Sequence, residues 1–103
     1  MGIDSERLET LDILIRGLIE TEIDSITPET MENWVSFKEV FPLSSLEDFI
    51  FGSVLGVLYC KFRIHFERAY RREPDRIETN RFFDIIERRT MEIRGKIKLA
   101  INR

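Results

Sequence analysis

The chain has 103 residues, of which 43% are hydrophobic and 34% are charged, and its formal net charge is −3. This composition is typical of one folded domain and excludes an intrinsically disordered chain. A single cysteine excludes an intrachain disulfide framework. Only five glycines and three prolines are present, which disfavours a protein of many short strands and turns. We therefore expect an all-α fold in which residues 1–103 form a single helical domain.

The first predicted helix ends at about residue 24. Apolar side chains recur along it at steps of three and four residues, at Leu8, Leu11, Ile15, Leu18 and Ile19. Charged residues lie mainly outside this stripe, so the helix should place one face on a core.

A short second helix is predicted to follow. Thr27 has the character of an N-cap, and Pro28 suits the first helical position, where its missing N–H is not needed. This helix should end at about residue 39. We expect its apolar residues Met31, Trp34 and Val35 to face inward.

The third predicted helix is long and central, from Ser44 to Arg72. Ser44 and Glu47 have the spacing of a capping box, which marks the start of a helix. Residues 49–60 are apolar or small on every side of a helical wheel. At least two neighbouring elements must therefore cover this stretch.

Pro74 lies in the only break between the third helix and the C-terminus. A fourth helix is predicted from there to about residue 101. The third and fourth helices, of roughly 29 and 27 residues, would each be about 40 Å long. Because the turn between them is short, they should form an antiparallel hairpin. The expected architecture is a four-helix, bundle-like domain in which the first helix and the short second helix brace this hairpin.

Aromatic residues concentrate in the distal half of the hairpin. The first helix would have to cover both halves, and the second is too short to help, so we expect an exposed aromatic seam that a second copy covers. The residues expected in this interface are Phe62, Phe66, Tyr70, Phe82 and Phe83.

Gly52 and Gly56 place small residues one turn apart on a single face of the third helix. Such a face lets another backbone approach closely. We favour a crossing with the first helix of the same chain, and keep a crossing with a second copy as the second choice for the interface.

Charge is divided unevenly along the chain. Residues 1–58 carry a net charge of −9 and residues 59–103 a net charge of +6. Arg68, Arg71, Arg72 and Arg76 surround the predicted hairpin turn and form a possible anion-binding site, as in contacts with nucleic-acid phosphates. Acidic residues are interleaved with these arginines, and the pI of about 5.2 is low for a nucleic-acid binder. Ion pairing with the acidic half, within the fold or across a dimer, is therefore favoured.

The sequence contains no recognisable catalytic constellation. His65 is the only histidine, and Cys60 lies five residues earlier, about 140° away around a helix, so the two cannot form a catalytic pair within one chain. Glu6, Glu9 and Asp12 lie mostly opposite the apolar stripe and should face water. We expect no catalytic residue, no metal ligand and no cofactor.

The longest apolar run has about 12 residues, fewer than the roughly 20 that a membrane helix needs. Acidic residues come early in the chain, where a secretion signal carries basic ones. We therefore expect a cytoplasmic protein that makes no membrane contact.

Taken together, these patterns favour a non-enzymatic helical interaction module. We expect it to self-associate, as a homodimer, and to act as an adaptor or regulatory subunit for an unknown protein partner. Nucleic-acid binding through the basic C-terminal half is the alternative. A metal-dependent enzyme with helix-borne carboxylates is the second alternative.

Overall fold

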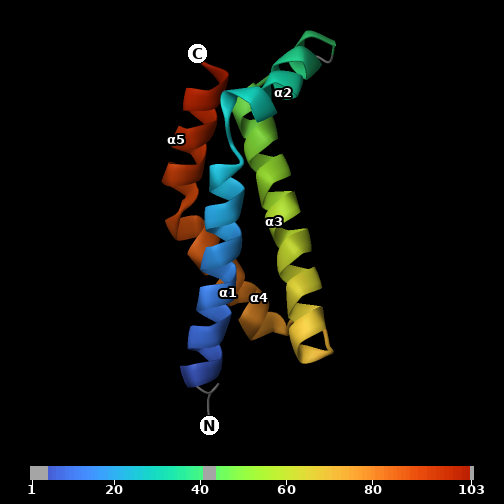
Figure 1. Ribbon diagram of the computed structural model, residues 1–103, viewed down its shortest axis with the longest axis vertical. Coiled ribbons are helices and arrows are strands. Elements are labelled where there is room, and N and C mark those ends of the chain that lie inside the picture. Colours follow the sequence, from blue (N-terminus) through green and yellow to red (C-terminus); the bar gives the residue numbers. More distant parts are fainter. Residues whose placement is uncertain (1–4, 41–43, 103) are drawn as a thin grey trace.

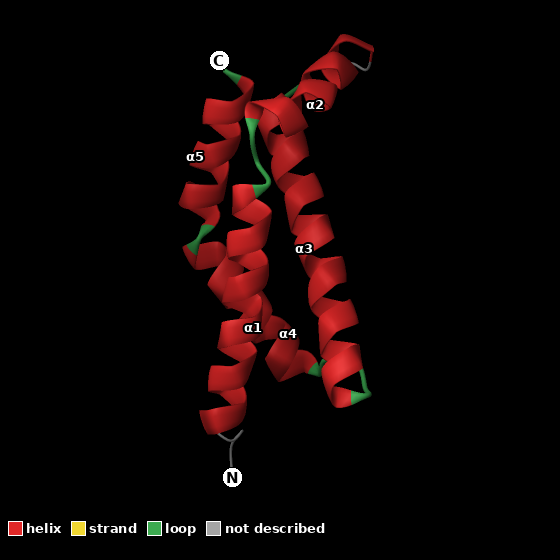
Figure 2. Ribbon diagram, viewed as in Figure 1, coloured by secondary structure: helices red, strands yellow, loops and turns green. Residues whose placement is uncertain are grey.

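The computed structural model describes residues 5–40 and 44–102. Within these ranges the chain forms helices and no strand, which confirms the expected all-α class (Figure 2). The helices are α1 (Ser5–Asp24), α2 (Pro28–Val40), α3 (Leu46–Tyr70), α4 (Arg76–Arg88) and α5 (Thr90–Ile101).

The molecule is elongated, with extents of 52 × 21 × 21 Å. α1 and α3 run in opposite directions, and α4 and α5 return along them towards the end of the molecule where α2 lies (Figure 1). α4 packs mainly on α1, whereas α5 packs on α2 and α3. Three rods therefore surround one core, and α2 covers only one end of it.

α3 begins one residue later than a cap at Ser44 would place it. The N-cap is Ser45, whose side chain accepts a hydrogen bond from the Asp48 N–H at 3.2 Å. The helix ends because Arg71 adopts the left-handed conformation, with φ of 58°. Its N–H donates to the carbonyl of Glu67 at 2.9 Å and closes the last turn. The predicted capping box between Ser44 and Glu47 is therefore wrong.

α4 and α5 replace the single fourth helix expected from the sequence, so that prediction is also wrong. The break lies at Arg89, whose φ of −102° and ψ of 4° leave the helical region. The hydroxyl of Thr90 donates to the Ile86 carbonyl at 3.1 Å. Hydroxyls that bond back in this way bend helices. The break lets α4 lie across α1 while α5 follows α2 and α3.

α2 begins as predicted from Thr27 and Pro28. The Thr30 N–H donates to the Thr27 side chain at 3.2 Å, and the Thr27 N–H donates to the Thr30 side chain at 2.9 Å. Met31 is buried, but Val35 is 39% exposed, so the expectation that Val35 faces inward is wrong. The reason is that α2 approaches α3 through Trp34, whose ring packs against Phe49 at 5.4 Å.

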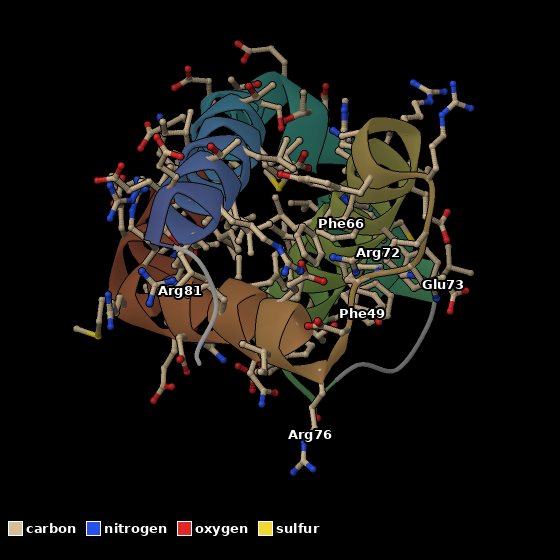
Figure 3. All side chains as sticks on the ribbon, turned by 90° about the horizontal axis from the view of Figure 1, so that it is seen from below. Phe49, Phe66, Arg72, Glu73, Arg76 and Arg81 are labelled. Atoms are coloured by element: carbon tan, nitrogen blue, oxygen red, sulfur yellow. The ribbon has the colours of Figure 1, made fainter. Side chains whose placement is uncertain are left out.

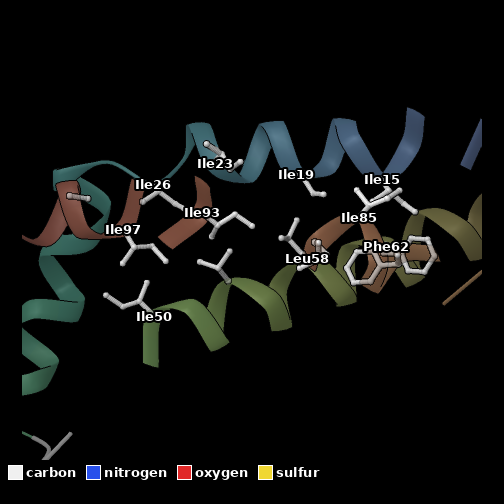
Figure 4. Close-up of a cluster of buried hydrophobic side chains, with 14 of the residues drawn as sticks. Ile15, Ile19, Ile23, Ile26, Ile50, Leu58, Phe62, Ile85, Ile93 and Ile97 are labelled. Atoms are coloured by element: carbon white, nitrogen blue, oxygen red, sulfur yellow. The ribbon is translucent and has the colours of Figure 1, made fainter. Parts of the chain in front are cut away.

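The core runs the length of the three rods (Figure 4). α3 contributes one row of buried side chains at steps of four residues. Burying each such side chain stabilises the fold by about 1.5–3 kcal/mol. The row consists of Leu46, Ile50, Val54, Leu58, Phe62 and Phe66.

Candidate interaction surface

The predicted aromatic seam is inside the molecule. Phe62 and Phe66 have exposed fractions of 0%, and Phe82 has 1%. The rings of Phe62 and Phe82 stack at 4.7 Å, and Figure 4 shows Phe62 in the same cluster as Ile15 of α1 and Ile85 of α4. The expectation that these three rings form an exposed interface is wrong. The physical reason is that α4 crosses onto α1, which closes the distal half of the core.

The other two seam residues lie at the edges of this core. Tyr70 is half-buried, and its ring centroid is 4.5 Å from that of Phe66. Phe83 is 52% exposed and stacks on Tyr59 of α3 at 5.8 Å, with 12° between the ring planes. Of the five predicted seam residues, Phe83 alone presents a largely open side chain.

The small-residue face of α3 is open. Gly52 and Gly56 are exposed, and a Cβ added to either glycine would meet no atom within 4 Å among the described residues. The predicted close crossing of α1 at these glycines is therefore wrong. α1 packs instead on the opposite side of α3, where the buried row of Ile50, Val54 and Leu58 lies.

The exposed side of α3 carries few charges over much of its length. Val57 is 43% exposed and Ile64 48%, while Leu55 and Tyr59 are half-buried. Arg63 is the one charged residue of α3 that lies among them; its side chain is 40% exposed and binds Glu73 at 2.7 Å. We call this surface the α3 outer face, formed by Gly52, Leu55, Gly56, Val57, Tyr59, Cys60, Ile64 and Phe83.

α3 is also long and apolar enough, by length and composition, to cross a membrane, although only 28% of the relevant 18-residue window is buried. This is weak evidence for a membrane span, because the core helix of a soluble bundle meets the same criteria.

Ion pairs connect the basic second half of the chain to the acidic first half. Arg81 binds Asp12 at 2.6 Å, and Arg89 binds Glu20 at 2.6 Å. Lys61 binds Glu22 at 2.9 Å. These contacts show the basic half pairing with the acidic half within the fold. The sequence favoured such pairing over an anion-binding site.

The four arginines proposed as an anion site do not converge. Arg72 binds both carboxylate oxygens of Glu78, at 2.7 and 2.8 Å, and its guanidinium carbon lies 4.9 Å from the centroid of the Phe66 ring. Figure 3 shows Arg76 pointing outward, away from Arg72. Arg68 and Arg71 are exposed, and neither pairs with an acidic residue in the described ranges.

Glu78 is the buried charge that the sequence analysis missed. Its side chain is 1% exposed and accepts hydrogen bonds from Arg7 of α1, from Arg72, and from the Asp75 N–H at 2.8 Å. The Glu78 N–H donates to Asp75 at 2.8 Å, which completes a capping box. The carboxylate thus joins the first turn of α4 to α1 and to the turn that follows α3. The sequence does contain a signal for this capping box. Asp75 and Glu78 are spaced three residues apart and follow a proline.

The residues considered for catalysis are dispersed. Among the described residues, no three His, Cys, Asp or Glu side chains gather where they could hold a metal ion. Glu6 and Glu9 line a surface hollow of about 560 Å³ beside Tyr70, whereas Asp12 is turned to Arg81. His65 lies with Lys61 beside a separate hollow between α1 and α3.

Comparison with known proteins finds no family model, no curated protein and no solved structure that matches the chain. The function is therefore argued from the surface of the molecule itself.

Proposed function

We propose that the protein is a non-enzymatic helical interaction module that self-associates as a homodimer and serves as an adaptor or regulatory subunit. In this proposal its working unit is four-helix and bundle-like. α3 and the α4–α5 pair form a long antiparallel hairpin, which α1 and the shorter α2 brace. One side of α3 is left for a partner.

The observation that carries the proposal is the apolar α3 outer face, within which Arg63 is the one charged residue of the helix. The cores of protein interfaces are depleted of charged residues, and large exposed apolar patches on soluble proteins mark interaction sites. Lys61 lies beside this surface and Arg63 within it, and each is already paired with a glutamate, at 2.9 and 2.7 Å. A partner can therefore cover the face without leaving an unpaired charge beneath it.

The size of the face suggests a low affinity. Val57, Ile64 and Phe83 are each roughly half exposed, so completing their burial would contribute about 1 kcal/mol each. Association itself costs several kcal/mol in lost freedom of motion. For two copies the gain from burial is about 6 kcal/mol, below the roughly 8 kcal/mol of a micromolar complex. We therefore expect a weak dimer, which forms in the upper part of a range of about 1–100 µM.

The test is the mass of the chain in solution. Sedimentation equilibrium between about 1 and 100 µM should show the 12.3 kDa chain shifting to twice that mass. Ile64→Glu should give a monomer with an unchanged helical spectrum. Met91→Glu is the matched control, because Met91 is 85% exposed on α5, a helix that contributes no residue to this face. A wild-type chain that stays monomeric over the whole range contradicts the proposal.

Nucleic-acid binding remains the alternative, with less support. Exposed positive charge is present at Arg68, Arg71 and Arg76. Arg72, however, is already paired with Glu78. A gel-shift assay at about 50 mM salt tests it, since phosphate contacts are strongest at low salt. Absence of a shift there dismisses it.

A further inference from the structure

The exposed side of α3 contains a complete row of residues at steps of four. All six of its members are exposed, and the row lies opposite the buried row of the same helix. Its two ends carry opposite charges, and its four central members carry none. The row consists of Asp48, Gly52, Gly56, Cys60, Ile64 and Arg68.

We infer that this row pairs with the same row of a second copy, with the two α3 helices antiparallel and a two-fold axis at the level of Leu58. The inference rests on the proposed function and specifies its partner and geometry. Rows at four-residue steps align when two helices cross at about −50°, the commonest packing class in globular proteins. Each residue then faces the one equally far from position 58 on the other copy.

The antiparallel register makes the row complementary in size. Gly56 would face the partner's Cys60, and Gly52 would face the partner's Ile64. The large side chain of Ile64 thus meets a position without a side chain, and no described atom lies within 4 Å of a Cβ built on Gly52. The half-exposed Ile64 side chain would gain the apolar contacts that it lacks in a single chain.

The same register makes the row complementary in charge. Asp48 would face the partner's Arg68, once on each side of the two-fold axis. The Asp48 side chain is 65% exposed even though it binds Arg94 at 2.7 Å, so it can accept a second arginine. Arg68 has no acidic partner within the described part of its own chain.

A parallel arrangement would have the opposite effect. It would place Asp48 beside the partner's Asp48 and Arg68 beside the partner's Arg68, and like charges in contact are repulsive. Antiparallel packing also places the negative C-terminal end of each helix dipole beside the positive N-terminal end of the other. Charge therefore selects a second copy in one orientation.

The first test is Gly56→Leu, which has opposite effects on the fold and on the dimer. In the single chain the new side chain points into open space, and leucine is the better helix former, so the melting temperature should rise. In the dimer it would collide with the partner subunit's Cys60. We expect the dimer dissociation constant to increase at least about tenfold.

Gly95→Leu is the matched control. Gly95 is a helical glycine on α5, which contributes no residue to the row, and a Cβ added to it would likewise meet no described atom within 4 Å. Its substitution should raise the melting temperature and leave the dissociation constant unchanged. Equal dissociation constants for the Gly56→Leu and wild-type chains would overturn the inferred contact.

The second test exchanges the charges at the ends of the row. Asp48→Arg and Arg68→Asp should each weaken the homodimer, because like charges then face each other twice. The chain with both substitutions should regain near wild-type affinity, and an equal mixture of the two single variants should form heterodimers. The double variant also lacks the Asp48–Arg94 ion pair, so its recovery cannot reflect that contact.

The outcomes separate the two proposals. A monomeric wild type overturns the proposed function, and the inference with it. A wild-type dimer whose affinity is unchanged by both single charge reversals overturns the antiparallel register alone. In a parallel dimer each substitution replaces a pair of like charges with another pair of like charges, so the affinity would not fall.

Discussion

Arg81 of α4 donates hydrogen bonds to both carboxylate oxygens of Asp12 on α1. Its Nε donates to Oδ1 at 2.7 Å and its Nη2 donates to Oδ2 at 2.6 Å, between residues 69 positions apart in the chain. Two parallel charge-assisted bonds fix direction as well as distance. This contact holds α4 against α1 and so helps to close the distal core.

The pH dependence of stability should reveal this contact. The hydrogen bond from Arg81 lowers the pKa of Asp12 below its ordinary value of 3.8. A carboxyl with a lower pKa in the folded state stabilises the fold above its unfolded pKa, and this stability is lost as the pH falls through the folded pKa. We expect Arg81→Met to lower the free energy of unfolding by about 1–2 kcal/mol at pH 7.

Urea denaturation of both chains at pH 7 and at about pH 2.5 measures the effect. The difference between them should shrink at the lower pH, where Asp12 is increasingly protonated in both. Arg76→Met is the control, because Arg76 lies exposed on the same helix with no acidic partner in the described ranges. A difference that is equal at both pH values contradicts the prediction.

A second prediction concerns the buried carboxylate of Glu78. Glu78→Gln keeps the shape but removes the charge that Arg7 and Arg72 share. Breaking a buried ion pair costs about 3–5 kcal/mol, and less where the partners stay in contact with water. The two arginine side chains are 33% and 42% exposed, so we expect a loss of about 2 kcal/mol.

Glu73→Gln provides the comparison for Glu78. The Glu73 side chain is 72% exposed and binds Arg63 at 2.7 Å, so its loss should cost less than about 1 kcal/mol. Chemical denaturation of both variants at neutral pH measures the two losses. Similar values would mean that the Glu78 carboxylate is hydrated in solution.

The elements that sequence reasoning predicted well are set by local chemistry. Thr27 and Pro28 fix the start of α2 through neighbouring backbone groups, and the period of apolar residues identifies α1 and α3. The break at Arg89 was missed because neither glycine nor proline marks it. The hydroxyl of Thr90 that bonds back to Ile86 is no signal either, because Thr21 and Ser53 make the same bond within unbroken helices.

The burial of the aromatic seam could not be predicted for a related reason. A periodic pattern shows which side chains need cover, but not which helix supplies it. On α4, for example, Ile77 is 57% exposed while Ile85 is buried. The path of α4 across α1 decides between them, and that path follows from the break at Arg89.

The candidate surface was visible in the sequence only in part. Gly52 and Gly56 were identified from their spacing. Their continuation to Asp48 and Arg68 needed the structure, because only the position of the buried row shows which residues of α3 are exposed. The structure was also needed to show that Glu78 is buried and binds two arginines, because its spacing from Asp75 indicates only a capping box.

Two neighbouring positions on α3 should respond very differently to truncation. Phe66 is fully buried beneath Arg72, so Phe66→Ala should cost about 3–5 kcal/mol. Ile64 is 48% exposed, and Ile64→Ala should cost less than about 1 kcal/mol in the monomer. Thermal unfolding of both variants at low concentration tests the contrast. Equal losses would mean that Phe66 also faces solvent, as an exposed seam requires.

Gly17→Ala should stabilise the monomer. Gly17 lies within α1, is exposed, and has no described atom within 4 Å of an added Cβ, so alanine should gain up to about 1 kcal/mol from helix propensity alone. The reciprocal control is Ala69→Gly on the exposed side of α3, which should lose a similar amount. In a domain of this size that corresponds to about 4–8 °C in melting temperature for each change. A Gly17→Ala chain that melts no higher than the wild type contradicts this prediction.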